Sequence, residues 1–192
     1  QLLKLNREKF KNKTIFKNKD INEFYTNTLN INNKTNSIHV PSKELGLIWL
    51  EKINLLYETS LENPYNSDWF CWIDAGISSL RNKVIENPVT ITNNIIHLLD
   101  KNKINYSTSE NNEVNTDWYN YKHNLAGGMF IIHKEKVEYY RNIFYEYLID
   151  CIDNCNDYPC YSDQIIWSKI KLNYPDYFHK LCDGYGCMID II

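Results

Sequence analysis

The sequence predicts an α/β fold in which a mixed sheet is flanked by helices within a single domain of 192 residues. Residues 69–73 form a short, continuously apolar run, which is typical of a strand buried on both faces. A helical pattern precedes this run, and a second apolar run at 129–132 is followed by another helical pattern. Helices that alternate with apolar strands are typical of layered α/β structures. No linker long enough to divide two domains interrupts the chain, so we assign residues 1–192 to one domain.

The first third of the chain contains one clear helical pattern. Residues 1–36 are polar, and Thr14–Phe16 is the candidate there for a short strand. Apolar residues recur at helical spacing over residues 42–58, and Ser42 is of the type that caps helix N-termini. Asn63-Pro64 then predicts a turn. A helix followed by a turn and a buried strand is the expected order here.

The middle of the chain predicts less regular structure. Residues 95–99 suggest a short helix, and the polar residues 108–115 suggest a loop. The second apolar run then leads into helical spacing over residues 134–152. We therefore expect the second strand to be followed directly by a long helix.

The last part of the chain predicts a helix and a hairpin. Ser162 is a candidate N-cap for a helix that carries apolar residues along one side. Residues 178–192 surround a glycine-rich turn at Gly184–Gly186, which predicts a β-hairpin. Cys182 and Cys187 flank this turn; buried free thiols are the favoured interpretation of the cysteines, with a cross-hairpin disulfide as the alternative.

Composition and charge exclude several kinds of partner. The net charge is −3 and the sequence pI is about 6.0, so the chain lacks the basic field that nucleic-acid binding requires. No apolar run approaches the ~20 residues that span a bilayer, and no signal peptide is visible. We expect a cytoplasmic location, including a host or viral cytoplasm. The chain begins at Gln1 rather than Met, so we also expect that an N-terminal part is trimmed, which leaves the secretory pathway open.

Asp74 is the first candidate for chemistry. It follows the first apolar run directly and precedes Ala75 and Gly76, so it is expected at the carboxyl end of a buried strand, where open α/β sheets bind ligands. A carboxylate there suits Mg²⁺ or Mn²⁺, and small neighbours let a phosphate or sugar approach the backbone. The alternative is a turn-forming aspartate that caps the next segment.

Other candidates are individually weak. Gly127 and Gly128 precede the second strand and permit a ligand to come close, although a turn explains them equally well. Asp163 and Gln164 begin a helix, where they can hold sugar hydroxyls or accept a proton, or can simply stabilise the helix start. His179 is a candidate ligand of Mn²⁺, although a lone histidine is more often structural. The candidate phosphate-binding cations, each otherwise an ordinary surface residue, are Lys52, Arg81 and Lys180.

Several segments, taken in order, resemble the WlaTC/HtrL family of bacterial glycosyltransferases. The most specific one, Phe70–Ile77, is similar to that family's "WIDAGI" signature. The match covers roughly residues 42–180. The other resembling segments are Leu50–Ile53, Asn63-Pro64, Ala126–Phe130, Ser162–Gln164 and Tyr174–Phe178.

The resemblance implies a GT-A-like (Rossmann-like) fold and a hexosyltransferase that moves a sugar from a nucleotide diphosphate, UDP-sugar above all, to a glycan or protein acceptor. It implies Mn²⁺ or Mg²⁺ held by Asp74 and His179, with Asp163 as the general base. Trp72 and Tyr185 can stack on a base or sugar ring. The residues expected to bind the nucleotide-sugar or the acceptor are Lys52, Trp72, Ala75, Gly76, Arg81, Gly127, Gly128, Gln164 and Lys180.

Two departures from the GT-A pattern keep alternatives open. Gly76 stands where the second aspartate of a D-x-D motif is expected, and no convincing opening strand for the nucleotide half is present. Either Thr14–Phe16 serves as that strand, or part of that half precedes Gln1. The alternatives are a non-catalytic sugar- or nucleotide-binding or structural module that retains the fold, and a metal-dependent hydrolase that uses Asp74, Asp163 and His179.

Overall fold

The computed structural model describes residues 8–29, 31, 40, 42–77, 93–109, 123–154 and 162–191. Its centre is a four-stranded sheet in the order β1-β3-β2-β4. The strands are β1 (Trp69–Ile73), β2 (Ile104–Thr108), β3 (Leu125–His133) and β4 (Phe178–Cys182). The mixed α/β class predicted from the sequence is therefore confirmed. The sheet order does not by itself establish a GT-A or Rossmann-like topology.

The strand directions decide where side chains can gather. β3 pairs antiparallel with both β1 and β2, whereas β2 pairs parallel with β4. Consequently β1, β2 and β4 all point the same way, and their carboxyl ends meet the amino end of β3 at one edge of the sheet. We call this edge the carboxyl edge.

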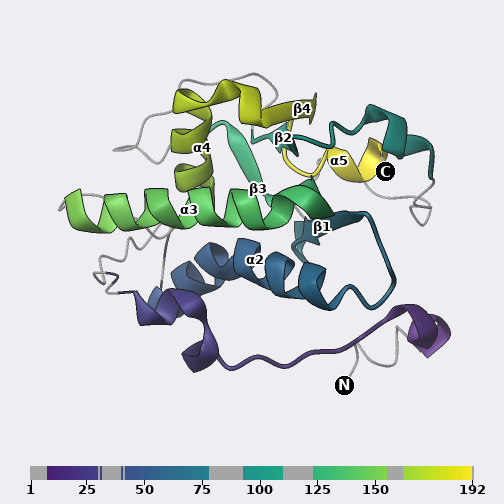
Figure 1. Cartoon of the computed structure of the whole chain (residues 1–192), viewed down its shortest axis with the longest axis horizontal. Coiled ribbons are helices and arrows are strands. Elements are labelled where there is room, and N and C mark those ends of the chain that lie inside the picture. Colours follow the sequence, from purple (N-terminus) through teal and green to yellow (C-terminus); the bar gives the residue numbers. More distant parts are fainter. Residues whose placement is uncertain are drawn as a thin grey trace.

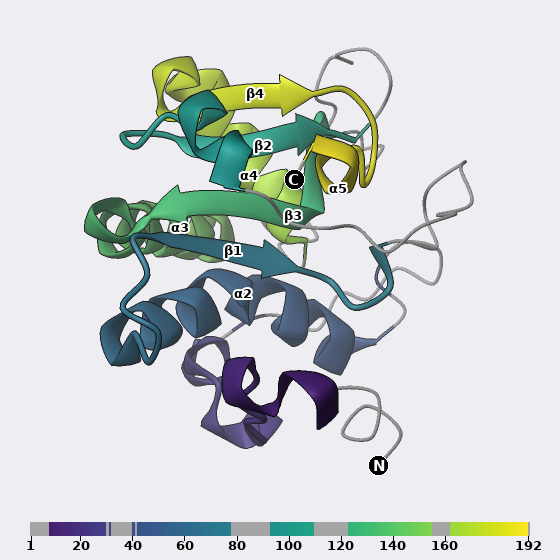
Figure 2. The same ribbon diagram turned by 90° about the vertical axis from the view of Figure 1, so that its right-hand side faces the viewer.

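Three helices cover one face of the sheet: α2 (Lys43–Glu62), α3 (Lys134–Asn154) and α4 (Asp163–Asn173) (Figure 1). The main core lies beneath them, where Leu50, Phe130, Phe144 and Trp167 are each at most 1% exposed. The short helix α5 (Met188–Ile191) lies on the other face (Figure 2), where a smaller core forms around Met129 and Met188. Within the described ranges no helix is long and apolar enough to cross a membrane.

The predicted helices are confirmed, and most extend beyond their expected ends. The Ser42 hydroxyl caps α2 by accepting a hydrogen bond from the Leu45 N–H at 3.2 Å. The helix ends at Asn63, whose left-handed φ of 35° terminates it one turn after the predicted end. Ser162 precedes α4 as expected, but its hydroxyl makes no capping hydrogen bond. The predicted short helix near residues 95–99 is the 3₁₀ helix η5 (Asn93–Leu98).

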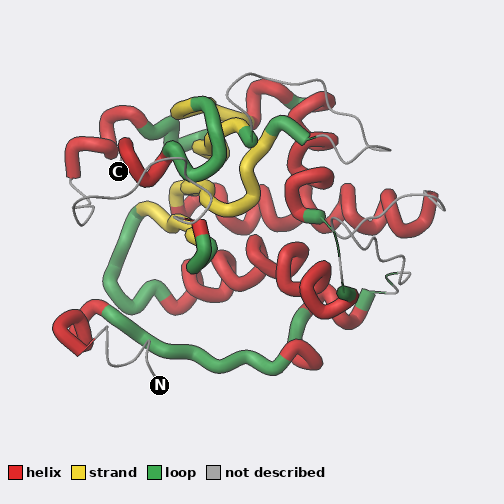
Figure 3. The backbone as a smooth tube through the Cα atoms, turned by 180° about the vertical axis from the view of Figure 1, so that it is seen from behind, coloured by secondary structure: helices red, strands yellow, loops and turns green. Residues whose placement is uncertain are grey.

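The N-terminal segment wraps around α2, and residues 8–29 of it add no strand to the sheet, so the prediction for Thr14–Phe16 is wrong. It contains the 3₁₀ helices η1 (Glu8–Lys13), η2 (Ile21–Glu23) and η3 (Tyr25–Thr28). The extended stretch between η1 and η2 runs past α2 (Figure 3), where Lys17 pairs with Glu62 and Lys19 with Glu58. Ion pairs to a helix, rather than strand pairing, hold this stretch.

One further prediction is wrong because the partner strand is distant in sequence. Residues 178–192 form β4 and α5 instead of a hairpin, since β4 pairs with β2 and not with the chain that follows it. The predicted loop at 108–115 begins with the last residue of β2, and residues 110–115 lie outside the described part. β2 is polar yet buried, because Asn105 satisfies its amide with the Asp100, Lys103 and Ile131 carbonyl oxygens.

Candidate functional site

The carboxyl edge brings together residues from α2, β1, β3 and α4. Asp74 follows β1 directly, and its backbone N–H donates to the Gly128 carbonyl oxygen at 2.8 Å. This hydrogen bond continues the ladder between β1 and β3, so the backbone position of Asp74 is fixed by the sheet. Asp163 is the first residue of α4, which packs against β3. Both predicted carboxylates therefore reach the same edge.

Lys52 joins the two carboxylates. Its Nζ lies 3.1 Å from Asp74 Oδ2 and 3.3 Å from Asp163 Oδ2, and it donates to the Gly127 carbonyl oxygen at 3.0 Å. The ammonium group therefore donates to Asp74 and to Gly127, while Asp163 lies within ion-pair distance of it. Lys52 thus bridges protein groups, and its expected role as a phosphate ligand stays a prediction. We call Lys52, Asp74 and Asp163 the charge cluster.

The members of the charge cluster differ in exposure. The side chains of Lys52 and Asp163 are 5% and 4% exposed, whereas that of Asp74 is 32% exposed. Burial lowers the pKa of Lys52, but Asp163 and Asp74 together more than offset this, so its net pKa is raised. Lys52 therefore stays protonated, and Asp74 is the carboxylate that a ligand meets first.

Asp163 is the less well satisfied carboxylate. Burial raises its pKa, and Asp74 adds to this effect while Lys52 opposes it. Burial is the largest of these effects and sets the upward direction of the pKa. Asp163 Oδ2 has contact with Lys52 but no hydrogen bond of good geometry. A buried oxygen in this state is a ready acceptor for a proton or a hydroxyl group.

Trp72 orients Asp74. Its indole Nε1 donates to Asp74 Oδ1 at 2.7 Å, and its ring lies 5.9 Å from Lys52 Nζ. The predicted stacking role of Trp72 is therefore accompanied by a hydrogen bond that the sequence did not reveal. Ala75 and Gly76 form an exposed turn immediately after Asp74, in the position predicted for a ligand to approach the backbone.

The two glycines are explained by packing within the protein. A Cβ on Gly127 would lie 2.5 Å from Asp163 Oδ2 and 2.6 Å from Gln164 Cγ. A Cβ on Gly128 would lie 2.8 Å from Ile77 Cδ1 and 3.1 Å from Tyr185 Cε1. The contacts at 2.5, 2.6 and 2.8 Å are shorter than real Cβ atoms make and the one at 3.1 Å is tight, so glycine lets the charge cluster close onto β3. The predicted reason, close approach of a ligand, is not required.

Gln164 and Tyr185 form a second layer beside the cluster. Gln164 Nε2 donates to the Leu125 carbonyl oxygen and to the Tyr185 hydroxyl, both at 3.2 Å. Burial raises the pKa of Tyr185, and the Asp163 and Asp74 carboxylates add to the increase. From the sequence Tyr185 was considered only as a stacking ring. A tyrosine between two glycines does not reveal that its hydroxyl contacts Gln164, the neighbour of Asp163.

The structure does not bring His179 and Lys180 to the cluster. His179 lies on β4 and pairs with Asn105 of β2, which is level with Ile131 of β3 and Cys71 of β1. Two strands, β2 and β3, therefore lie between His179 and β1, and Asp74 is three residues further along from Cys71. Its ring contacts the Leu98 carbonyl oxygen at 3.0 Å, and the expected metal role is not supported. Lys180 is exposed and pairs with Asp183 at 3.2 Å. Arg81 lies outside the described residues.

The expected divalent cation has one protein ligand in the described part of the chain. No group of three or more His, Cys, Asp or Glu side chains there is arranged to hold a metal. Asp74 is exposed, and a carboxylate has lone pairs beyond the two that Lys52 and Trp72 use. Mg²⁺ is often held by one or two carboxylates together with substrate phosphates. Asp74 alone fits this mode, whereas a site with His179 does not.

Comparison with known proteins supplies a family but no activity. A family model described as a bacterial protein of unknown function (HtrL_YibB) matches residues 2–191. No curated protein and no solved structure matches the chain. The resemblance drawn from the sequence is thereby corrected: the matching family is not described as one of glycosyltransferases, and the match does not support a "WIDAGI" signature.

Proposed function

The chain belongs to the bacterial family HtrL_YibB, whose function is unknown, and from the charge cluster we propose that it is a glycosyltransferase. In this proposal a sugar moves from a nucleotide diphosphate to a hydroxyl group of a glycan or protein acceptor at the carboxyl edge of the sheet. The observation that carries it is the buried Asp163 oxygen, which has Lys52 at 3.3 Å and no hydrogen bond.

The polar groups of the edge match a hydroxyl-rich ligand. A hydroxyl group both donates and accepts hydrogen bonds. Asp163 and Asp74 offer acceptors, and the Tyr185 hydroxyl, which accepts from Gln164, still carries a proton to donate. Donors and acceptors that converge at one edge of an α/β sheet are typical of sites that orient a polar ligand. A sugar presents several hydroxyl groups that can pair with such donors and acceptors.

Asp74 is the residue that we assign to the diphosphate side. It is the exposed carboxylate of the cluster, and Trp72 and Lys52 fix both of its oxygens. Asp74 would hold Mn²⁺ or Mg²⁺, and a cation bound there would neutralise the leaving diphosphate. Lys52 remains buried behind Asp74 and pairs with it at 3.1 Å.

Asp163 is the proposed proton acceptor. As the acceptor oxygen bonds to the anomeric carbon, its proton passes to Asp163; the bond from that carbon to the diphosphate oxygen breaks, and the electron pair stays on the diphosphate. The raised pKa of Asp163 brings the carboxylate nearer to the value that an efficient base needs. A direct displacement of this kind inverts the configuration at the anomeric carbon.

The test combines binding and turnover. We would measure thermal shifts of the wild-type protein and Asp74→Ala with a panel of nucleotide-sugars, each with and without Mn²⁺. A ligand that binds the native state raises the melting temperature. We expect one donor to give a Mn²⁺-dependent shift that Asp74→Ala loses, and we expect Mn²⁺ alone to bind weakly because Asp74 supplies one ligand. Asp150→Asn, on the surface of α3, is the matched control.

The outcomes separate the proposal from its rivals. Transfer of the sugar to an acceptor, with inversion seen by NMR, would support the transferase. Release of free sugar without an acceptor would indicate a hydrolase. A donor that binds but is never consumed would indicate a binding module, and no shift with any nucleotide-sugar would contradict the proposal.

A further inference from the structure

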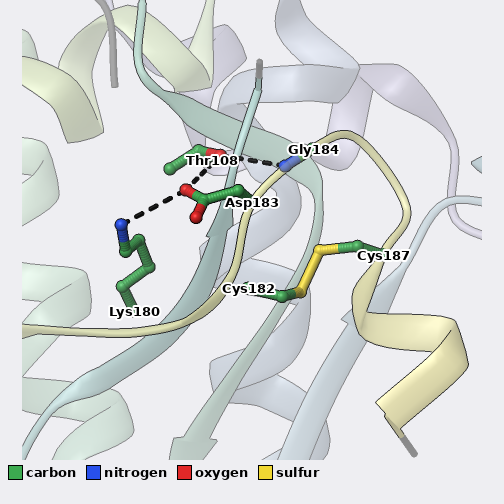
Figure 4. Close-up of a disulfide and its surroundings, with 6 residues drawn as sticks. All are labelled: Thr108, Lys180, Cys182, Asp183, Gly184 and Cys187. Atoms are coloured by element: carbon green, nitrogen blue, oxygen red, sulfur yellow. Dashed lines mark hydrogen bonds and ion pairs between the residues drawn. A yellow bond between two sulfur atoms is a disulfide. The ribbon is translucent and has the colours of Figure 1, made fainter. Parts of the chain in front are cut away.

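A disulfide closes a six-residue loop at the end of β4. Cys182 and Cys187 are bonded, so the interpretation favoured from the sequence, free thiols, is wrong for this pair (Figure 4). The loop lies at the carboxyl edge of the sheet, because Cys182 is the last residue of β4 and pairs with Ser107 of β2. The loop therefore starts at β4, and two strands, β2 and β3, lie between β4 and β1, the strand that ends at the charge cluster.

The first half of this loop is anchored to β2. The Thr108 hydroxyl donates to Asp183 Oδ1 at 3.1 Å and accepts from the Gly184 N–H at 2.9 Å (Figure 4). Lys180 also donates to Asp183 Oδ1, at 3.2 Å. Gly184 and Gly186 have φ of 105° and 75°, a region that residues with a side chain rarely adopt. The loop thus has a defined path, and Tyr185 stands between its two glycines.

This path delivers Tyr185 to the candidate site. Its hydroxyl accepts from Gln164, the neighbour of Asp163, and its ring packs on Gly128, where a Cβ would lie 3.1 Å from Cε1. The same Cβ position is 3.5 Å from Asp74 Oδ2, so the tyrosine ring and Asp74 flank one glycine. Tyr185 is therefore a wall of the site, although it comes from a different strand end.

The Tyr185 hydroxyl has a proton that it can donate to a ligand. Its oxygen accepts a hydrogen bond from Gln164 Nε2 at 3.2 Å. No acceptor for its proton is found among the residues that the structure describes. Burial and the nearby carboxylates raise its pKa, so the phenol keeps that proton at neutral pH. An oxygen of the ligand can complete this hydrogen bond.

We propose that Tyr185 is a substrate-positioning residue that donates a hydrogen bond to a sugar oxygen, and that the Cys182–Cys187 disulfide holds it in place. The substrate part of this inference rests on the proposed function. Reduction by a dithiol converts the disulfide to two cysteine thiols while the dithiol becomes a cyclic disulfide. Loss of that bond frees the loop end next to Tyr185, so ligand affinity falls in the reduced protein.

The first experiment needs no ligand. The side-chain amide of Gln164 reports the contact with Tyr185 in an NMR spectrum of ¹⁵N-labelled protein. We expect this resonance to shift in Tyr185→Phe, and to shift towards the same position on reduction with dithiothreitol and in Cys182→Ala/Cys187→Ala. Cys71→Ala is the matched control, since Cys71 is a free cysteine and its loss leaves the loop intact. An unchanged Gln164 resonance in the reduced protein would overturn the proposal that the disulfide holds Tyr185 in place.

The second experiment measures KM and kcat for the nucleotide-sugar or acceptor that binds the wild-type protein. Tyr185→Phe removes one neutral hydrogen bond, so we expect KM to rise about 3- to 10-fold with little change in kcat. The cysteine double variant should show a similar rise, and adding Tyr185→Phe to it should have no further effect, because both act through one contact. Effects that multiply, or an unchanged KM in Tyr185→Phe, would overturn the positioning role. If no donor binds the wild type while the Gln164 resonance still shifts, the proposed function fails, but the disulfide is still shown to hold Tyr185 in place.

Discussion

Glu51 and Asp163 are both buried carboxylates, and comparing their surroundings separates two regions of the molecule. Glu51 lies at the seam between α2 and the N-terminal segment, and its side chain is fully buried. It accepts hydrogen bonds from the Tyr25 and Thr26 N–H groups at 3.1 and 3.0 Å, from the Thr26 hydroxyl at 2.9 Å and from Asn54 at 2.7 Å. These four donors satisfy both oxygens, so Glu51 fastens the segment that precedes α2.

Asp163 has a similar burial but far fewer partners. It faces Lys52, the residue next to Glu51 in the sequence, at 3.3 Å, and Lys52 is shared with Asp74 and Gly127. Neighbouring residues of one helix thus serve two different purposes. A saturated buried carboxylate stabilises a fold, whereas an incompletely satisfied one beside an exposed carboxylate is a candidate for chemistry. The variants below test this distinction.

Asp163→Asn should have the largest effect, and the effect should fall on turnover. The amide keeps the shape of the side chain but cannot accept the proton, and loss of a general base costs on the order of 10²- to 10⁴-fold in kcat. Stability should change by less than about 1 kcal/mol, because the substitution removes an excess buried charge. Initial rates of sugar transfer and urea unfolding would measure the two quantities. An unchanged kcat would show that Asp163 serves only as a charge partner of Lys52.

Lys52→Met should have the largest effect on stability. It leaves Asp74 and Asp163 facing each other without a cation, and breaking a buried pair in this way typically costs about 3–5 kcal/mol. The free energy of unfolding in urea is the measurement. Lys134→Met is the matched control, because Lys134 pairs with Asp68 at the surface, where ion pairs contribute about 0–1 kcal/mol. Equal losses of unfolding free energy in the two variants would mean that the buried charge cluster contributes no more to stability than a surface ion pair.

Glu51→Gln should affect stability and spare turnover. Glutamine offers one acceptor oxygen, so its NH₂ group would face donors that now have no acceptor, at a cost of about 1–3 kcal/mol. The kcat and KM should remain those of the wild type, since Glu51 contacts the N-terminal segment and not the carboxyl edge. Thermal unfolding and the same rate assay would decide. A loss of turnover without a loss of stability would remove the contrast with Asp163.

The fold was predictable where local sequence decides structure. The strand β1, the Ser42 cap of α2 and the placement of Asp74 directly after β1 all follow from residue types and spacing. The expected burial of this strand on both faces is wrong, because β1 lies at the edge of the sheet and only Phe70 is buried in it. The carboxyl edge was also predictable, because a carboxylate that follows a buried strand is expected there. These signals located Asp74 and Asp163 without knowledge of the sheet order.

The remaining features depend on long-range pairing. β2 is buried although three of its five residues are polar, and its partners lie on β3 and β4. His179 was expected near Asp74, but a residue's place along the chain does not tell which strand its own strand pairs with. The Cys182–Cys187 bond and the return of Tyr185 to Gln164 likewise require the path of the loop. Lys52 was identified as a cation, but its position between Asp74, Asp163 and the Gly127 carbonyl oxygen required the packing of α2 against β1 and α4.

The smallest expected effect is a pH dependence of stability that belongs to Asp163. Its folded pKa is raised above the ordinary value of 3.8, mainly by burial, so the native state holds the proton more tightly than the unfolded chain does. The stabilisation is therefore fully present below about pH 4 and is lost as the pH rises through the folded pKa. Removing the titrating group in Asp163→Asn should abolish this trend. The unfolding free energy of the wild type minus that of the variant should thus decrease with pH, by at most about 1.4 kcal/mol per pH unit.

Urea titrations at pH 4, 5, 6 and 7 would measure this difference, in which the other carboxylates cancel. Lys52 does not interfere, because its own pKa is raised above 10.5 and its contribution is lost only at higher pH. Asp150→Asn, at an exposed ion pair, should give a nearly flat difference. If the Asp163 difference were flat or increased with pH, Lys52 would compensate the Asp163 charge fully. Asp163 would then be as well satisfied as Glu51, and the argument for a proton acceptor at this edge would lose its physical basis.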